Sequence, residues 1–308
     1  MQNNSNKNFP LHGWIGLVTL ALSQTALVLR LEPVTTHFYS LIWWPYILTV
    51  DGLVYRLRGH SLIKNRKREF ILLIPWSVAL WLIFEAFNLV LRNWYYIGVP
   101  REMSLRWPGY FVAFGTVLPA VFETRELLDT WGVFKKSQVP EVRFSPQGHL
   151  LIILVGSTML LLSLVWPLYA FPLVWGGFVF LLDPVNYRRG RSSLFEDLEQ
   201  GSLTKFYQLL LAGLICGGLW EFWNYWATAK WIYTVPWVGE VKLFEMPVLG
   251  FLGFPPFAVE CYVMAHYLRI YETDPARPNW SWKAVPLWAV LFAVMFWAID
   301  QYTVRLYA

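Results

Sequence analysis

The chain has little charge for its length. Of its 308 residues, 15% are charged and 56% are hydrophobic, which is far from the composition of a soluble domain. Apolar stretches of about 20 residues, the length that crosses a bilayer as a helix, recur along the chain. We therefore expect an all-α, polytopic integral membrane protein. The net charge of +5 lies in the loops, so it indicates membrane orientation and gives no support to nucleic-acid binding.

Residues that bind metals or cofactors are also scarce. Cys216 and Cys261 both lie in apolar stretches, so neither a structural disulfide nor a cysteine metal site is expected. The 5 histidines form no HxxxH or HxxE pair, which disfavours membrane di-iron enzymes. The sequence contains no phosphate-binding loop, nucleophile elbow or CxxC motif. We expect no metal and no cofactor.

Nine stretches are candidate membrane spans. The first follows a polar tail and has no cleavage site after it, so we expect a retained helix. Prolines and paired glycines interrupt the sixth, which is the least regular. The expected spans are 11–31, 38–57, 70–91, 108–127, 149–166, 168–185, 204–227, 245–270 and 284–304.

Basic residues gather in alternate loops, those after the second, fourth, sixth and eighth spans. The intervening loops carry far fewer. The positive-inside rule then places the N-terminus in the cytoplasm and the C-terminus outside. For a bacterial protein this predicts a multi-pass protein of the inner (cytoplasmic) membrane.

Several residues recur at a nearly fixed offset, which indicates an internal repeat. Asp51 returns as Asp183 after 132 positions, and the glutamate of a Pro-x-x-x-Glu motif, Glu123, returns as Glu260 after 137. Offsets of 136, 136 and 137 positions relate Glu85, Asn88 and Tyr96 to Glu221, Asn224 and Tyr233. We expect two four-helix repeats, parallel because each has an even number of helices, plus a ninth helix. The expected segments are a cytoplasmic tail (1–10), a first repeat (11–127), a cytoplasmic linker (128–148), a second repeat (149–270), and a loop with the ninth helix (271–308).

The Glu-Asn pairs are the first candidates for a site. A spacing of three places Glu85 with Asn88, and Glu221 with Asn224, on one face of a helix. At about 1.5 Å per residue, both glutamates fall in the outer third of the membrane. Two interpretations stay open: Asn and Glu hold helices together, or the four side chains form a reactive or ligand-binding pocket.

Further acids divide into two groups. Glu123, Glu260, Asp51 and Asp183 belong to the inner side. The two aspartates lie next to Arg56 and Arg188, and we expect them to form structural ion pairs or contacts at helix ends. Glu245 aligns with Arg106 of the first repeat, so one copy alone carries an acid there. This asymmetry fits an active-site acid and an interface charge equally well.

The aromatic residues around Glu221 suggest a pocket for a cation. Many of the 19 tryptophans are explained by aromatic belts at the membrane interfaces. Trp220, Trp223 and Trp226, however, crowd around Glu221, and Trp231 and Tyr233 follow in the next loop. Ring faces stabilise a desolvated cation by about 2 kcal/mol each. An acid among such rings suits protonation of an alkene.

These motifs resemble the small membrane lycopene cyclase domains of the heterodimeric type. Repeats of that family carry Trp-Asp-Asn, then Trp-x-Tyr about ten residues later, then Pro-x-Glu-Glu. In this chain Glu221 replaces the Asp, Asn224 follows three residues on, and Glu245 precedes Pro247 without a second acid. The similarity covers residues 70–125 and 205–265. The chain also resembles a group of uncharacterised bacterial polytopic membrane proteins.

The resemblance and the residues together predict a cofactor-free cyclase or isomerase that protonates an isoprenoid (carotenoid- or terpenoid-like) lipid. Glu221, Glu245 and Glu85 are the candidate acids. The expected substrate-binding residues are Asn88, Asn224, Trp220, Trp223, Trp231 and Tyr233. Two alternatives remain: a lipid or small-molecule transporter or binding protein, and a non-catalytic membrane assembly factor. The expected partners are a hydrophobic lipid and the membrane, with no nucleic acid; a homo-oligomer is left open.

The topology is directly testable. A tag on the N-terminus should be protected from protease in intact cells, and a tag on the C-terminus should be accessible. Finding both tags on one side would remove a helix from the expected nine and contradict the repeat.

Overall fold

The computed structural model describes residues 7–237, 241–268 and 285–305. Part of the expected N-terminal tail and most of the loop before the ninth helix lie outside these residues. The protein is mostly helical, and seven helices within the described part are long and apolar enough to cross a membrane. The expectation of an all-α membrane protein is confirmed at this level. The count of nine spans is not.

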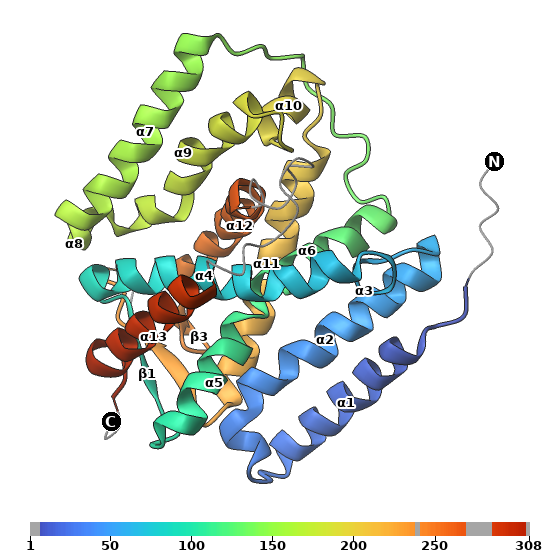
Figure 1. The fold of residues 1–308 in the computed structure, drawn as a ribbon, viewed down its shortest axis with the longest axis vertical. Coiled ribbons are helices and arrows are strands. Elements are labelled where there is room, and N and C mark those ends of the chain that lie inside the picture. Colours follow the sequence, from blue (N-terminus) through green and yellow to red (C-terminus); the bar gives the residue numbers. More distant parts are fainter. Residues whose placement is uncertain (1–6, 238–240, 269–284, 306–308) are drawn as a thin grey trace.

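Both halves of the chain contain two helices, a short helix, a long helix, a strand and a final helix in this order, and they differ in the further elements between these (Figure 1). The first half consists of α1 (Leu11–Val28), α2 (Val34–Arg58), α3 (Leu62–Asn65), α4 (Lys67–Leu91), β1 (Trp94–Ile97), α5 (Met103–Phe114) and α6 (Val117–Thr130). The second half consists of α7 (Pro146–Val165), α8 (Pro167–Ala170), η1 (Phe171–Leu173), α9 (Val174–Arg188), α10 (Leu194–Glu199), α11 (Thr204–Trp226), β2 (Lys230–Tyr233), β3 (Lys242–Leu243), β4 (Met246–Pro247), η2 (Val248–Gly253) and α12 (Phe254–Leu268). Helix α13 (Val285–Tyr302) follows.

Helices α4, α6, α11 and α12 form the centre of the molecule. Helix α6 packs on α4 and α11, and α12 packs on the same two helices. The hairpin α1–α2 lies against α6, and the hairpin α7–α9 lies against α12, on opposite sides of the centre (Figure 1). The interior is dry and aromatic, with Phe38, Trp43 and Phe84 almost fully buried.

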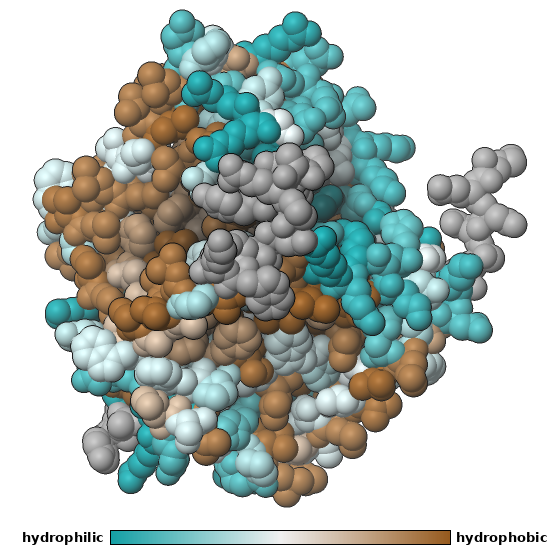
Figure 2. Space-filling view, in the orientation of Figure 1, coloured by the Kyte–Doolittle hydropathy of each residue, from teal (hydrophilic) through white to brown (hydrophobic). Residues whose placement is uncertain are grey.

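The outward faces of α1, α7 and α13 are apolar. Figure 2 shows hydrophobic side chains over the region of α7, while hydrophilic ones gather at the loop ends. Leu22, Leu151 and Leu287, one from each helix, are 64%, 63% and 71% exposed. Such exposure of large apolar side chains fits contact with lipid.

Three expected spans differ from the structure. The expected span 108–127 is divided at Gly115 into α5 and α6, and Ser77 bridges the break by donating to the Phe114 carbonyl at 2.5 Å and accepting from the Leu118 amide at 3.0 Å. The expected span 245–270 begins as β4 and the 3-10 helix η2 before α12. Helix α2 covers 38–57, but it is not among the seven apolar helices because its residues are less apolar.

A short ribbon joins the two halves. Strand β1 pairs antiparallel with β2, so that Trp94 lies opposite Tyr233 and Tyr96 lies opposite Trp231. The two strands come from segments 137 positions apart, and each begins a few residues after the end of a central helix, α4 or α11. The ribbon therefore places the two Trp-x-Tyr motifs side by side.

The contact between α11 and α12 predicts a sharp difference between two neighbouring glycines. A Cβ on Gly213 would lie 2.3 Å from the Phe254 carbonyl oxygen, whereas a Cβ on Gly218 would meet nothing within 4 Å. Gly213→Ala should therefore cost about 1–3 kcal/mol through overpacking. Gly218→Ala, in the same helix, should be neutral or slightly stabilising. Thermal unfolding of both purified variants tests this; equal midpoints would contradict the packing.

Candidate functional site

An asparagine near the end of α4 and another near the end of α11 hold the strands that follow these two helices. Asn88 donates to the Trp94 carbonyl at 2.9 Å and accepts from the amides of Asn93 and Trp94 at 2.8 and 3.2 Å. Asn224 donates to the Trp231 carbonyl and accepts from the Trp231 amide, both at 2.9 Å. We expected these side chains to orient the glutamates and bind substrate. Instead, the hydrogen bonds of both carboxamides go to the backbone of the ribbon.

A glutamate lies behind each strand and accepts a hydrogen bond from its tyrosine. The Tyr96 hydroxyl donates to Glu85 at 2.5 Å, and the Tyr233 hydroxyl donates to Glu221 at 2.8 Å. Both glutamates are fully buried. Burial, and then the neighbouring glutamate, raises the pKa of each tyrosine well above the usual 10, so both phenols keep their protons.

The two carboxyl groups differ in how completely they are bonded. One oxygen of Glu85 also accepts from the indole nitrogens of Trp81 at 2.9 Å and Trp94 at 3.0 Å. Position 217, which lies 136 positions after Trp81 just as Glu221 lies 136 after Glu85, is a glycine, and Phe254 occupies the adjacent space. Glu221 therefore lacks one of the donors that fix Glu85.

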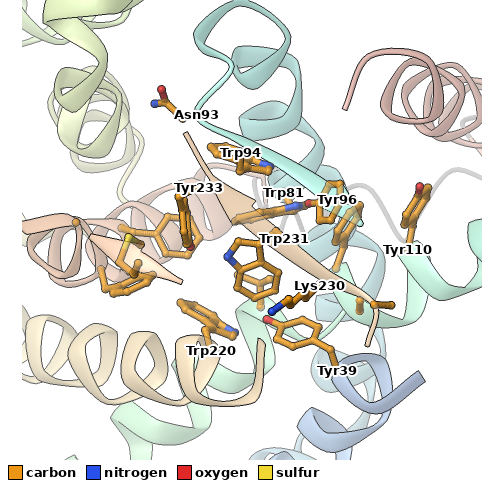
Figure 3. A pocket seen from close by; sticks show the side chains of 18 of the residues that line it. Tyr39, Trp81, Asn93, Trp94, Tyr96, Tyr110, Trp220, Lys230, Trp231 and Tyr233 are labelled. Carbon is orange, nitrogen blue, oxygen red and sulfur yellow. The ribbon is translucent and has the colours of Figure 1, made fainter. Parts of the chain in front are cut away.

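A cavity of about 460 Å³ lies along the ribbon (Figure 3). Of the expected site residues, Trp220, Trp231 and Tyr233 line it. Glu85, Glu221, Glu245, Asn88, Asn224 and Trp223 are not among its lining residues. The two buried glutamates thus reach the cavity only through residues that line it: Glu221 through Tyr233, and Glu85 through Trp81, Trp94 and Tyr96.

Trp223 belongs to an aromatic cluster beneath the cavity. Its ring centroid lies 4.8 Å from that of Trp43 and 6.0 Å from that of Tyr46. Trp220 connects this cluster to the cavity, because it packs at 5.5 Å on Trp43 while also lining the cavity wall. Trp223 therefore lies outside the cavity, in the aromatic cluster that Trp220 connects to the cavity wall.

The charged groups at the cavity are paired. Lys230, which lines the cavity, binds Glu245 at 2.6 Å, and this contact favours the interpretation of Glu245 as an interface charge. Arg106, also in the lining, binds both carboxylate oxygens of Asp300 on α13 at 2.7 and 2.6 Å.

Sequence reasoning missed several lining residues. Tyr39 in α2, Trp81 in α4, Trp175 in α9 and Tyr110 in α5 all contribute to the wall. A signal existed for one further residue, Trp94, because it lies 137 positions before Trp231. The others belong to none of the repeated motifs, although α2, α4 and α9 each carry a repeated acid.

The inner aspartates organise short helices. Asp51 accepts from His12, from the Ser61 hydroxyl at 2.8 Å and from the Ile63 amide at 2.7 Å, at the start of α3. Asp183 accepts from the amides of Leu194 and Phe195 at the start of α10. Of the two expected roles, ion pairs with Arg56 and Arg188 or contacts at helix ends, the structure has the second, because these carboxylates bind backbone amides at helix N-termini.

The inner glutamates are fully buried on the central helices. Glu260 accepts from the Phe178 amide at 3.1 Å, three residues after the non-helical Trp175 of α9. Glu123 in α6 is equally buried, and within the described part of the chain neither of its carboxylate oxygens has a hydrogen-bond partner. Among the described residues, no three His, Cys, Asp or Glu side chains gather closely enough to hold a metal ion.

Comparison with protein-family models, curated proteins and solved structures finds no match for this chain.

The asparagine contacts predict the stability of the ribbon. Asn88→Ala and Asn224→Ala should each leave buried backbone groups without partners, at about 1–3 kcal/mol per group. The amides of residues 94–97 and 230–233 should then exchange with solvent faster, which hydrogen–deuterium exchange measures. Gln301→Ala, at an exposed position of α13, is the control. Unchanged exchange in both Asn variants would show that the ribbon does not need these contacts.

Proposed function

We propose that the chain is a duplicated unit, with residues 11–127 and 149–270 as parallel four-helix repeats in a bacterial inner membrane, N-terminus inside. The common order of elements supports this. Matching contacts of Asn88 with Asn224, and of Glu85 with Glu221, support it further. The ribbon register also agrees, since a shift of 137 positions exchanges its two Trp-Tyr pairs.

We propose that this protein binds an elongated isoprenoid-type lipid in the cavity along the ribbon and cyclises or isomerises it by protonation. The cavity itself is the main support: its wall is largely aromatic and apolar. Among its lining residues, Leu105, Leu249 and Leu252 are 53%, 61% and 71% exposed. A cavity bordered by exposed leucines on a membrane protein is suited to a ligand that enters from the bilayer.

Glu221 and Tyr233 would supply the proton. With its carboxyl group protonated, Glu221 donates its proton to the Tyr233 oxygen. At the same time, the Tyr233 hydroxyl transfers its own proton to a carbon of a lipid double bond. This step forms a C–H bond and a carbocation. The π electrons of a neighbouring double bond then form the ring, or the cation rearranges. The carbocation then loses a proton to the Tyr233 oxygen while the Tyr233 hydroxyl returns its proton to the Glu221 carboxylate. The reaction therefore consumes no net proton.

The aromatic wall suits the intermediate. Rings of Trp94, Trp220 and Trp231 line the cavity on both sides of Tyr233. Each ring face stabilises a desolvated cation by about 2 kcal/mol. A wall with few polar groups also keeps water away from the carbocation. In this proposal Glu85 is a structural counterpart, because three donors hold one of its oxygens.

Transport is less well supported. A transporter would need a polar path from the outer cluster to Glu123 and Glu260. Both glutamates are fully buried and neither lines the cavity. A protein that binds the lipid without catalysis would use the same cavity. The Glu221 variant distinguishes this function from catalysis.

Glu221→Gln should leave the fold intact and lower turnover. Gln keeps the volume and can still accept from Tyr233, but it removes the acid, so the loss should be about 10²–10⁴-fold. The product is measured in lipid extracts of cells expressing each form, beside thermal unfolding of the purified proteins. Glu85→Gln, the matched control, should lose less.

A structural Glu221 gives a different result. If it is charged and paired, Gln should destabilise the protein by about 3–5 kcal/mol. Early unfolding without loss of any lipid product would contradict the catalytic assignment.

A further inference from the structure

The two ends of the cavity differ in their hydrogen-bond donors. We call the region of Trp81, Trp94, Tyr96 and Tyr110 the Glu85 end, and the region of Tyr39, Trp220 and Lys230 the Lys230 end; Figure 3 shows the two groups separated across the ribbon.

Donors at the Glu85 end are already used. The indoles of Trp81 and Trp94 and the hydroxyl of Tyr96 all donate to Glu85. The Tyr110 hydroxyl donates to Asp300 at 2.9 Å. A ligand at this end meets ring faces and aliphatic groups, so it gains most from burying apolar surface.

Donors at the Lys230 end remain available. The indole nitrogen of Trp220 has no hydrogen-bond partner, although the side chain is 95% buried. Lys230 uses its ammonium group for Glu245 at 2.6 Å and, weakly, for the Tyr225 carbonyl at 3.4 Å. Because an ammonium group has three N–H donors, one is left over.

An unpartnered buried donor is unfavourable, and a ligand can remove the cost. Burying an N–H group without an acceptor costs about 1–3 kcal/mol. An indole N–H donates only, and so does an ammonium group. The complementary ligand group is therefore an acceptor. A cationic amine is disfavoured, because it would lie beside the Lys230 charge.

We propose that the lipid carries an oxygen acceptor at one end, and that this oxygen binds at Trp220 and Lys230 while the apolar chain extends to the Glu85 end. This rests on the proposed function in one respect, that the cavity binds an isoprenoid-type lipid. It goes beyond it by assigning the ligand a polar head and a direction. A hydroxyl, a carbonyl and a phosphate ester share this acceptor chemistry.

The test compares three tritiated C20 probes on the full-length protein in phosphatidylcholine nanodiscs: geranylgeraniol, geranylgeranyl diphosphate and the matched tetraene hydrocarbon in which a methyl group replaces the CH₂OH head. The alcohol or the diphosphate should bind about tenfold more tightly than the hydrocarbon, the value of one good hydrogen bond. Which of the two binds more tightly identifies the head group.

Variants locate the effect. Trp220→Phe keeps the ring and removes the N–H, so it should abolish most of the tenfold preference while hydrocarbon binding stays. Trp14→Phe, on the exposed face of α1, should keep the preference. Gly109→Leu should fill the cavity, because a Cβ at Gly109 meets nothing within 4 Å, and should weaken all three probes.

The outcomes separate the two proposals. Equal binding of all three probes, weakened by Gly109→Leu, would overturn the polar head and leave lipid binding in the cavity intact. A preference that survives Trp220→Phe would also overturn the assignment of the oxygen to Trp220. Failure of every probe to bind, or binding unaffected by Gly109→Leu, would overturn lipid binding in the cavity and the head group with it.

Discussion

The hydrogen bonds from Asn88 and Asn224 to the ribbon are the constraint on which the site depends. Each central helix ends near the membrane surface, where the chain must turn and its backbone groups still need partners. One carboxamide can donate to a carbonyl and accept from an amide at once, so a single residue fixes both groups of Trp94 or of Trp231. With these residues held, the alternation of the strand directs Trp94 and Tyr96, or Trp231 and Tyr233, to the same side.

Much of this could be predicted from the sequence, but the roles could not. The recurrence of Glu, Asn and Tyr identifies residues that make corresponding contacts, because a repeated unit preserves its local hydrogen bonds. Spacing on a helix places Asn224 and Glu221 on one face, yet it does not reveal that Asn224 turns to the chain beyond the helix. Likewise, no local pattern brings Tyr39 of α2 to Trp231, where their rings lie 4.7 Å apart. That contact depends on how whole helices pack.

Interrupted spans illustrate the same limit. Apolar composition predicts one span over residues 108–127, but not that the helix divides there and that Ser77, on another helix, satisfies the backbone where α5 and α6 separate. In the second half, Gly213 stands at the position of Ser77, and the close approach of α12 to its backbone replaces the hydroxyl. A serine hydroxyl in the first half and a close helix contact in the second half therefore stabilise corresponding places. The charged residues at the cavity also differ between the two halves. Arg106 and Glu245 have opposite signs, and each forms an ion pair with a residue of a different element.

The ribbon has a consequence for how such a protein arises. Within either half alone, β1 or β2 has no strand beside it among the described elements, and an unpaired edge recruits another strand. A half-length ancestor with this strand would complete the edge only by pairing with a second copy of itself. The two strands would then be antiparallel, and the two copies would be related by a two-fold axis. Fusing the two copies keeps the pairing and frees each half to change independently. The glycine that replaced Trp81 and the lysine beside Trp231 are changes that an obligatory pair of identical chains would have to make twice.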